Sequence, residues 1–224
     1  MPPPHFPINP VQLGIELTST IIIAILAIII FVKTKELASI SKKKSISLFR
    51  YSFLFFGLAY VLRFLMMTSR VTVSLSSLFH QFPGMTFLIF TPLVIFFSLT
   101  AIMTLTSSVI KKFQDKKHIL LYICLISFAI SIISFLSQAM IILVILELIL
   151  FIVAFVLMYM QNKRIRKKRK QLYWIYYLLF LAWLMSLFIT IPVRVRIPHE
   201  IIIIPHIISI IVFSIILRKV SKLN

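Results

Sequence analysis

Long apolar segments alternate with short basic segments along this chain, and the alternation predicts its fold. A helix needs about 20 apolar residues to cross a bilayer at ~1.5 Å per residue. Such segments must be helical, because backbone polar groups find no partners in lipid. The sequence therefore predicts an all-α, polytopic transmembrane bundle of seven helices in a single domain, residues 1–224. The predicted helices are 11–32, 47–67, 85–110, 119–137, 140–160, 172–191 and 201–217.

Lysine and arginine gather at one end of the predicted helices. All but four of the 24 basic side chains fall in the clusters 33–50, 111–117, 163–170 and 218–222. Cytoplasmic loops collect Lys and Arg, so these clusters mark the inside. We expect the N-terminus outside and the C-terminus in the cytoplasm. The four basic residues elsewhere are Arg63, Arg70, Arg194 and Arg196.

The helices predicted at 119–137 and 140–160 share one nearly unbroken apolar run. As a single helix the run would measure roughly 63 Å, about twice a ~30 Å hydrocarbon core. The basic clusters before and after it are both inside, so an even number of crossings must separate them. Two helices joined by a tight outer turn at Ser137 and Gln138 satisfy both conditions.

Composition agrees with a bilayer as the solvent. Hydrophobic residues make up 61% of the chain and the mean hydropathy is +1.08, whereas soluble chains are roughly 45–50% apolar. The pI of about 10.5 does not indicate nucleic acid, because the charge lies in short loops where orientation and anionic inner-leaflet lipids explain it. Residues 1–10 contain no Lys or Arg, so we expect the first helix to be retained in a cell (plasma) membrane protein, not cleaved as a signal peptide.

Ionisable residues inside predicted helices are the candidates for function, because such groups are costly in a membrane. Arg63, Glu147, His206 and Glu16 all fall roughly 6–11 Å below the outer surface, counted from the predicted helix ends at ~1.5 Å per residue. At one depth they are expected to line a single outward-facing cavity. Glu147 must be protonated or paired, and Arg63 is its candidate partner. The alternative is structural: Arg63 and Glu16 reach the headgroups, and His206 is simply hydrogen-bonded.

The outer loop before the last helix carries two further basic residues, Arg194 and Arg196. They lie above the predicted cavity, where they either cover it and attract an anionic ligand or contact lipid headgroups. A separate pattern, Ser127, Ser131, Ser134 and Ser137, places four hydroxyls on one face of a helix and predicts close packing with interhelical hydrogen bonds.

The sequence indicates no cofactor, no metal and no enzyme. His206 is the sole histidine within a predicted span, so a bis-histidine haem site has no second ligand, and Cys124 is the single cysteine. No His-Glu-x-x-His pair, Cys-x-x-Cys motif or Gly-rich phosphate loop is present. Retinal would need a lysine buried in mid-helix, and Lys219 of the last helix falls at its inner end.

The stretch Lys33–Leu37, with Lys42–Lys44, Phe49–Arg50, Phe53–Tyr60 and Arg63–Phe64, resembles uncharacterised small multi-pass membrane proteins of archaea. The seven-helix topology is similar to that of membrane sensor modules that precede histidine kinases, although this sequence contains no kinase domain. From the buried polar residues together with this topology we expect a receptor-like or sensor-like module, with a small outer polar cavity for an anionic ligand and a protein partner at the cytoplasmic loops. The alternatives are a small secondary transporter, with Glu147 coupling protons, and an accessory membrane subunit.

The orientation is testable by cysteine labelling in a Cys124→Ser background. A membrane-impermeant maleimide added to intact cells should label His80→Cys and leave Ile165→Cys unlabelled, because the first position is predicted outside and the second inside. Permeabilised cells, in which both should react, provide the control. The reverse labelling pattern would overturn the predicted orientation.

Overall fold

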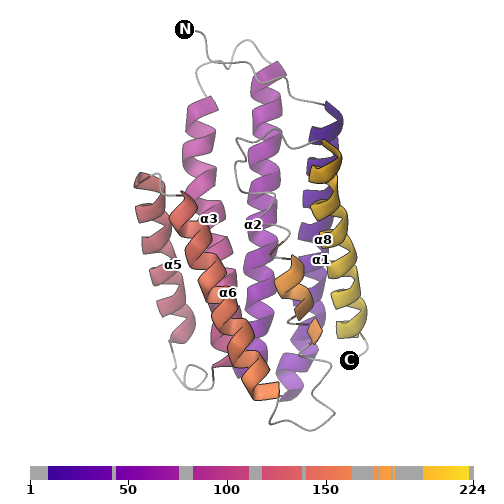
Figure 1. Ribbon diagram of the computed structural model, residues 1–224, viewed down its shortest axis with the longest axis vertical. Helices are drawn as coiled ribbons and strands as arrows, with labels where there is room; N and C mark the ends of the chain where they lie inside the picture. Colours follow the sequence, from indigo (N-terminus) through magenta and orange to yellow (C-terminus); the bar gives the residue numbers. More distant parts are fainter. Residues whose placement is uncertain are drawn as a thin grey trace.

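The structure, a computed structural model, describes residues 10–41, 44–75, 83–110, 118–137, 140–162, 174–175, 177–182, 184 and 199–221. The long helices of this part run side by side along one direction (Figure 1). The all-α architecture is therefore confirmed for the described residues. The helices are α1 (Pro10–Ser41), α2 (Lys44–Leu75), α3 (Pro83–Val109), α5 (Ile119–Leu136), α6 (Met140–Asn162) and α8 (His199–Ser221).

Five of these helices, α1, α2, α3, α5 and α8, are long and apolar enough to cross a membrane. In α6 the corresponding apolar stretch among the described side chains is shorter, Ile145–Leu157. The helix predicted at 172–191 is described at 174–175, 177–182 and 184, and all of these residues are helical. The prediction of several helices long and apolar enough to span a membrane is thus confirmed.

Two helices are longer than their apolar patterns predict. α1 and α2 have 32 residues each, roughly 48 Å at ~1.5 Å per residue. α1 continues past residue 32 to Ser41 because residues 33–41 contain no proline or glycine and include the good helix formers Lys, Glu, Leu and Ala. α2 continues past residue 67 to Leu75, and residues 68–75 likewise contain no proline or glycine to end the helix.

The turn between α5 and α6 lies where the length argument places it. α5 ends at Leu136 and α6 begins at Met140, so the apolar run is divided into two helices of 18 and 23 residues. α3 begins at Pro83, a residue favoured in the first turn of a helix. α8 begins at His199, slightly before the predicted start.

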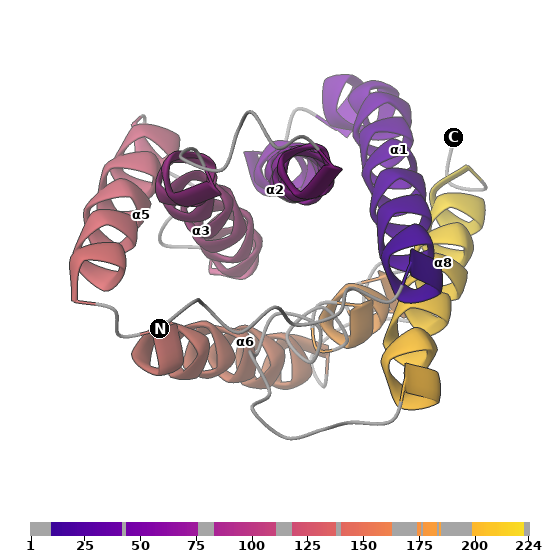
Figure 2. The ribbon, with the colours of Figure 1, turned by 90° about the horizontal axis from the view of Figure 1, so that it is seen from above.

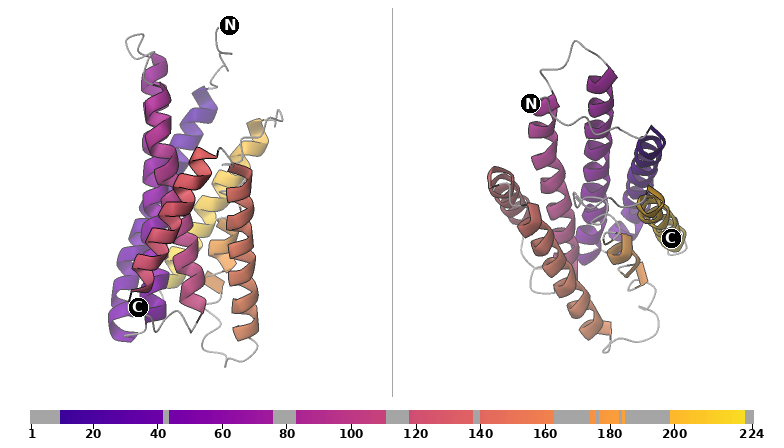
Figure 3. Two further views of the ribbon diagram at one scale, coloured as in Figure 1. Left: turned by 90° about the vertical axis from the view of Figure 1, so that its left-hand side faces the viewer. Right: turned by 45° about the horizontal axis from the view of Figure 1, so that its top comes forward.

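α2 is the middle helix in the series of neighbouring contacts. α2 packs between α1 and α3, α8 packs against α1, and α5 and α6 pack against α3. Seen from above, α5, α3, α2 and α1 follow an arc and α6 lies across from it (Figure 2); the tilts of the helices are visible from the side (Figure 3). We call the end that holds Pro10 and His199 the outer end, following the charge pattern.

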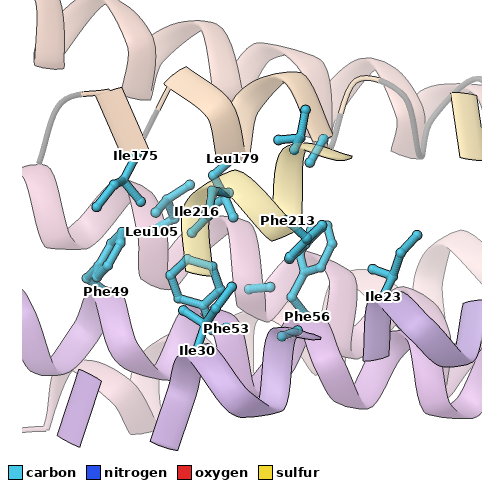
Figure 4. Close-up of a cluster of buried hydrophobic side chains, with 14 of the residues drawn as sticks. Ile23, Ile30, Phe49, Phe53, Phe56, Leu105, Ile175, Leu179, Phe213 and Ile216 are labelled. Atoms are coloured by element: carbon cyan, nitrogen blue, oxygen red, sulfur yellow. The ribbon is translucent and has the colours of Figure 1, made fainter. Parts of the chain in front are cut away.

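Aromatic and branched side chains fill the interior toward the inner end. Phe56 of α2 lies against Phe213 of α8, with ring centroids 5.6 Å apart. Phe49 and Phe53, one turn apart on α2, meet edge to face at 5.0 Å. Burial of this apolar surface holds helices from both ends of the sequence together. The labelled side chains in Figure 4 are Ile23, Ile30, Phe49, Phe53, Phe56, Leu105, Ile175, Leu179, Phe213 and Ile216.

The outer faces of the helices are apolar as well, as expected for contact with lipid. α8 exposes a row of isoleucines spaced three or four residues apart, whereas its opposite face is buried. α5 exposes leucine, isoleucine and phenylalanine over most of its surface. The exposed isoleucines of α8 are Ile204, Ile207, Ile211 and Ile215.

A glycine sets the close approach of α1 and α2. A Cβ atom at Gly57 would lie 3.2 Å from Cγ1 of Ile28 and 3.5 Å from Cβ of Ala27. Small residues at helix contacts let backbones approach closely in membranes, where packing drives association. At Gly14 a Cβ atom would meet nothing within 4 Å.

Gly57→Val should therefore destabilise the bundle by about 1–3 kcal/mol through overpacking against Ile28. Gly14→Val is the matched control, because it makes the same change of side chain in α1 without a steric neighbour. The measurement is the free energy of unfolding in mixed detergent micelles. Equal effects of the two substitutions would contradict the close packing at Gly57.

Candidate functional site

The buried face of α8 carries the first candidate residue, His206. His206 is 3% exposed and Ser209, one turn further along, is fully buried. The same face continues with Phe213 and Ile216 of the core. His206 therefore points into the bundle, not toward lipid or headgroups. Ser209 was not identified from the sequence, although its spacing of three from His206 places it on the same helical face.

Ser19 of α1 binds the imidazole of His206. The Oγ atom of Ser19 lies 2.7 Å from Nδ1 of His206. The same hydroxyl is 3.0 Å from the carbonyl oxygen of Glu16, which also accepts a hydrogen bond from Thr20. If Nδ1 carries the proton, it donates to Ser19; if Nε2 carries it, Ser19 donates to Nδ1. In both tautomers Nε2 is left to interact with another group.

α2 brings Arg63 and Tyr60 to the same region. Arg63 is half-buried, and its positive charge acts on His206. Tyr60 lies one turn outward from Phe56, just as Ser209 lies one turn outward from Phe213, and the Phe56 and Phe213 rings are in contact. These levels on α2 and α8 place Tyr60, Arg63 and Ser209 near the Ser19–His206 contact. We call Ser19, Tyr60, Arg63, His206 and Ser209 of α1, α2 and α8 the polar cluster.

Two polar atoms of this cluster lack hydrogen-bond partners. Nε2 of His206 and Oγ of Ser209 are buried and unpartnered among the residues that the structure describes. Most buried hydroxyls here behave differently: Thr104 and Thr34, for example, donate to carbonyl oxygens of their own helices. A buried polar group without a partner costs about 1–3 kcal/mol, so such groups in a native protein require an explanation. A bound ligand would supply one.

Glu147 lies in a second, separate polar contact. Its side chain is 4% exposed, and the hydroxyl of Ser98 on α3 donates to Oε1 at 3.1 Å. Among the described residues no cation lies within salt-bridge distance of this carboxyl. The partner expected from the sequence, Arg63, is replaced by Ser98.

The helix register explains why Glu147 and Arg63 are apart. Phe55 of α2 stacks on Phe97 of α3, next to Ser98, with centroids 6.2 Å apart. Arg63 is two turns further outward on α2, roughly 12 Å at ~1.5 Å per residue. Glu147 therefore lies deeper in the bundle than Arg63. The helix register thus differs from the expectation that Glu147 shares one depth with Arg63, His206 and Glu16.

The remaining expectations concern other segments. Arg194 and Arg196 lie outside the described residues. On α5, Ser127, Ser131 and Ser134 are buried. Ser131 donates to the carbonyl oxygen of Pro92 on α3, and Ser127 to the sulfur of Met103. The prediction that this serine face packs a neighbouring helix is confirmed, whereas Ser137 bonds within its own helix.

Known proteins offer no comparison for this geometry: no family model, no curated protein and no solved structure matches the chain. Any function must therefore be argued from the polar groups themselves.

Ser19→Ala should destabilise the protein by about 1–3 kcal/mol, because it leaves Nδ1 of His206 buried without its partner. The free energy of unfolding in mixed micelles measures this effect. Ser214→Ala on α8 is the control: its hydroxyl is exposed and bonds only Ile210 of the same helix, so the change should stay within about 0.5 kcal/mol. In a His206→Leu background, Ser19→Ala should cost less. An equal cost in both backgrounds would show that the two side chains are not coupled.

Proposed function

We propose that this chain is an integral membrane protein of the receptor-like or sensor-like kind, which binds a small ligand in the outer half of the bundle. The site lies between α1, α2 and α8. One observation carries the proposal: Nε2 of His206 and Oγ of Ser209, one turn apart on α8, are deeply buried and unpartnered within the described residues. Intramembrane polar groups that face the bundle interior mark ligand or ion sites.

The chemistry of the cluster favours a ligand with an anionic group. Arg63 supplies a positive charge close to His206. Nε2 of His206 and the hydroxyl of Ser209 offer one hydrogen bond each, and the hydroxyl can donate or accept. Arg194 and Arg196, which precede α8 in the sequence, would add positive charge near the outer end of the site. Such a set of convergent polar groups in an apolar surrounding is typical of small-molecule sites.

Signalling from this site would pass to the inner end of the bundle. α8 carries His206 near its outer end and Arg218 and Lys219 in its last turn. Lys219 lies over the ring of Trp174 at 5.4 Å. A ligand that shifts α8 against α1 would therefore change the position of inner basic groups, which can contact anionic lipids of the plasma membrane or a cytoplasmic protein partner.

An accessory membrane subunit is the second candidate. The Ser19–His206 hydrogen bond favours it, because a buried bond between distant helices also holds a bundle together without any ligand. The two functions differ in what they require of Ser209. A purely structural cluster gains nothing from an unpartnered hydroxyl, whereas a ligand site uses it.

The test is a thermal-stability screen of the purified protein in detergent with small carboxylates, inorganic phosphate and phosphate monoesters. A ligand present at about 100 times its Kd should stabilise the folded state by ~2.7 kcal/mol. Arg63→Gln and Ser209→Ala should remove that stabilisation, whereas Glu147→Gln, which changes the separate contact on α6, should retain it. A stabilisation that Arg63→Gln and Ser209→Ala leave unchanged would contradict the site. A panel without any stabilising compound would favour the accessory role.

A further inference from the structure

Glu147 has an environment unlike that of any other carboxyl group in the sequence. The helix that carries it, α6, and the two long helices that pack around it, α3 and α5, contain no Lys, Arg or His and no second Asp or Glu. The other four acidic residues are Glu16, Glu36, Asp115 and Glu200, and in the sequence they lie nearer to the ends of the apolar segments or within the basic segments between them.

Among the described residues, the titratable groups on the elements that pack around Glu147 are few and weak. α3 contributes none, α5 contributes Tyr122 and Cys124, and α6 itself contributes Tyr159. Tyr177, in the helical residues 177–182, contacts Phe155 of α6. All four side chains belong to the inner halves of their helices, whereas Glu147 is in the outer half of α6.

The physical alternatives for a buried carboxyl are pairing with a cation or retention of its proton. An isolated ionised carboxylate in an apolar medium is very costly, by tens of kcal/mol in an idealised medium of low dielectric constant, so such a group becomes neutral instead. Pairing within the described residues is absent, and the hydrogen bond from Ser98 occupies only one oxygen atom. One hydroxyl cannot replace the hydration of a carboxylate.

We infer that Glu147 is a proton-binding site: it carries a proton in the closed bundle, Ser98 positions it against α3, and it exchanges this proton with water when α6 separates locally from α3. Glu147 lies seven positions from the outer end of α6 at Met140, about 10 Å of helix, and roughly 22 Å from the inner end at Asn162. The inference is independent of the ligand site between α1, α2 and α8.

A proton site in this place would couple protonation to helix contact. With the proton bound, α6 rests against α3 with no buried charge. Loss of the proton places a charge in the apolar contact, which favours an arrangement that admits water or a cation. This is the property that a proton-coupled transporter or a pH-dependent receptor requires, and it gives the transport alternative its specific support.

Infrared spectroscopy of the reconstituted full-length protein tests the inference directly. At neutral pH the wild-type protein should show the carbonyl stretch of a protonated carboxylic acid, and Glu147→Gln should abolish it. Ser98→Ala should shift the band to higher wavenumber, because the hydrogen bond to the carboxyl is lost. Glu16→Gln is the matched control and should leave the band in place. Absence of the band at neutral pH, or a band that Glu147→Gln leaves unchanged, would overturn the inference.

Two further measurements keep the result independent of folding defects in the variants. In D2O the wild-type band should shift as the proton exchanges; a band that never shifts would contradict exchange with water. An apolar carbodiimide, which adds to protonated carboxylic acids and is retained as an N-acylurea, should label Glu147, whereas a water-soluble carbodiimide should label the other carboxyls. Labelling of Glu147 by the water-soluble reagent alone would place the group in water and refute the buried proton site.

Discussion

Hydroxyl groups buried in this bundle must find hydrogen-bond acceptors inside the protein, because the surrounding lipid offers none. Most of them use their own helix: Thr100, Thr104 and Ser108 of α3 donate to carbonyl oxygens three or four residues earlier. Such local bonds satisfy the hydroxyl but do not fix the position of a neighbouring helix. The bonds that cross between helices are therefore the informative ones, and the arrangement of the bundle depends on a small set of them, together with apolar packing.

Those crossing bonds divide the polar interior into separate contacts. Ser19 joins α1 to α8 through His206, Ser98 joins α3 to α6 through Glu147, and Ser131 joins α5 to α3 through a backbone carbonyl. Phe56 and Phe213 belong to the aromatic core toward the inner end. Their contact fixes the register of α2 and α8 on the inner side of the Ser19–His206 hydrogen bond. Each polar contact is thus held in place by apolar packing, and the proposed ligand site and the proposed proton site are separable by substitution.

Counting depth from predicted helix ends places Arg63 and Glu147 at one level, and the structure shows why this counting fails. The apolar pattern ends α2 near residue 67, but the helix continues to Leu75 because no breaker intervenes. Helix ends then do not share one plane, and equal distances from them do not mean equal depths. The stacked rings of Phe55 and Phe97 define the register of α2 against α3. This register places Ser98, and with it Glu147, closer to the inner end of the bundle than Arg63.

The sequence by itself determined the helical class, the apolar segments, the division of the long run into α5 and α6, and the serine face of α5. It also determined that Glu147 had to be either paired or protonated. These properties depend on hydrophobicity, charge and periodicity within single segments, which act locally. Only the tertiary structure decided the partners, because Ser19 and His206 are 187 positions apart and their meeting depends on the rotation and register of packed helices. No local pattern encodes those two quantities.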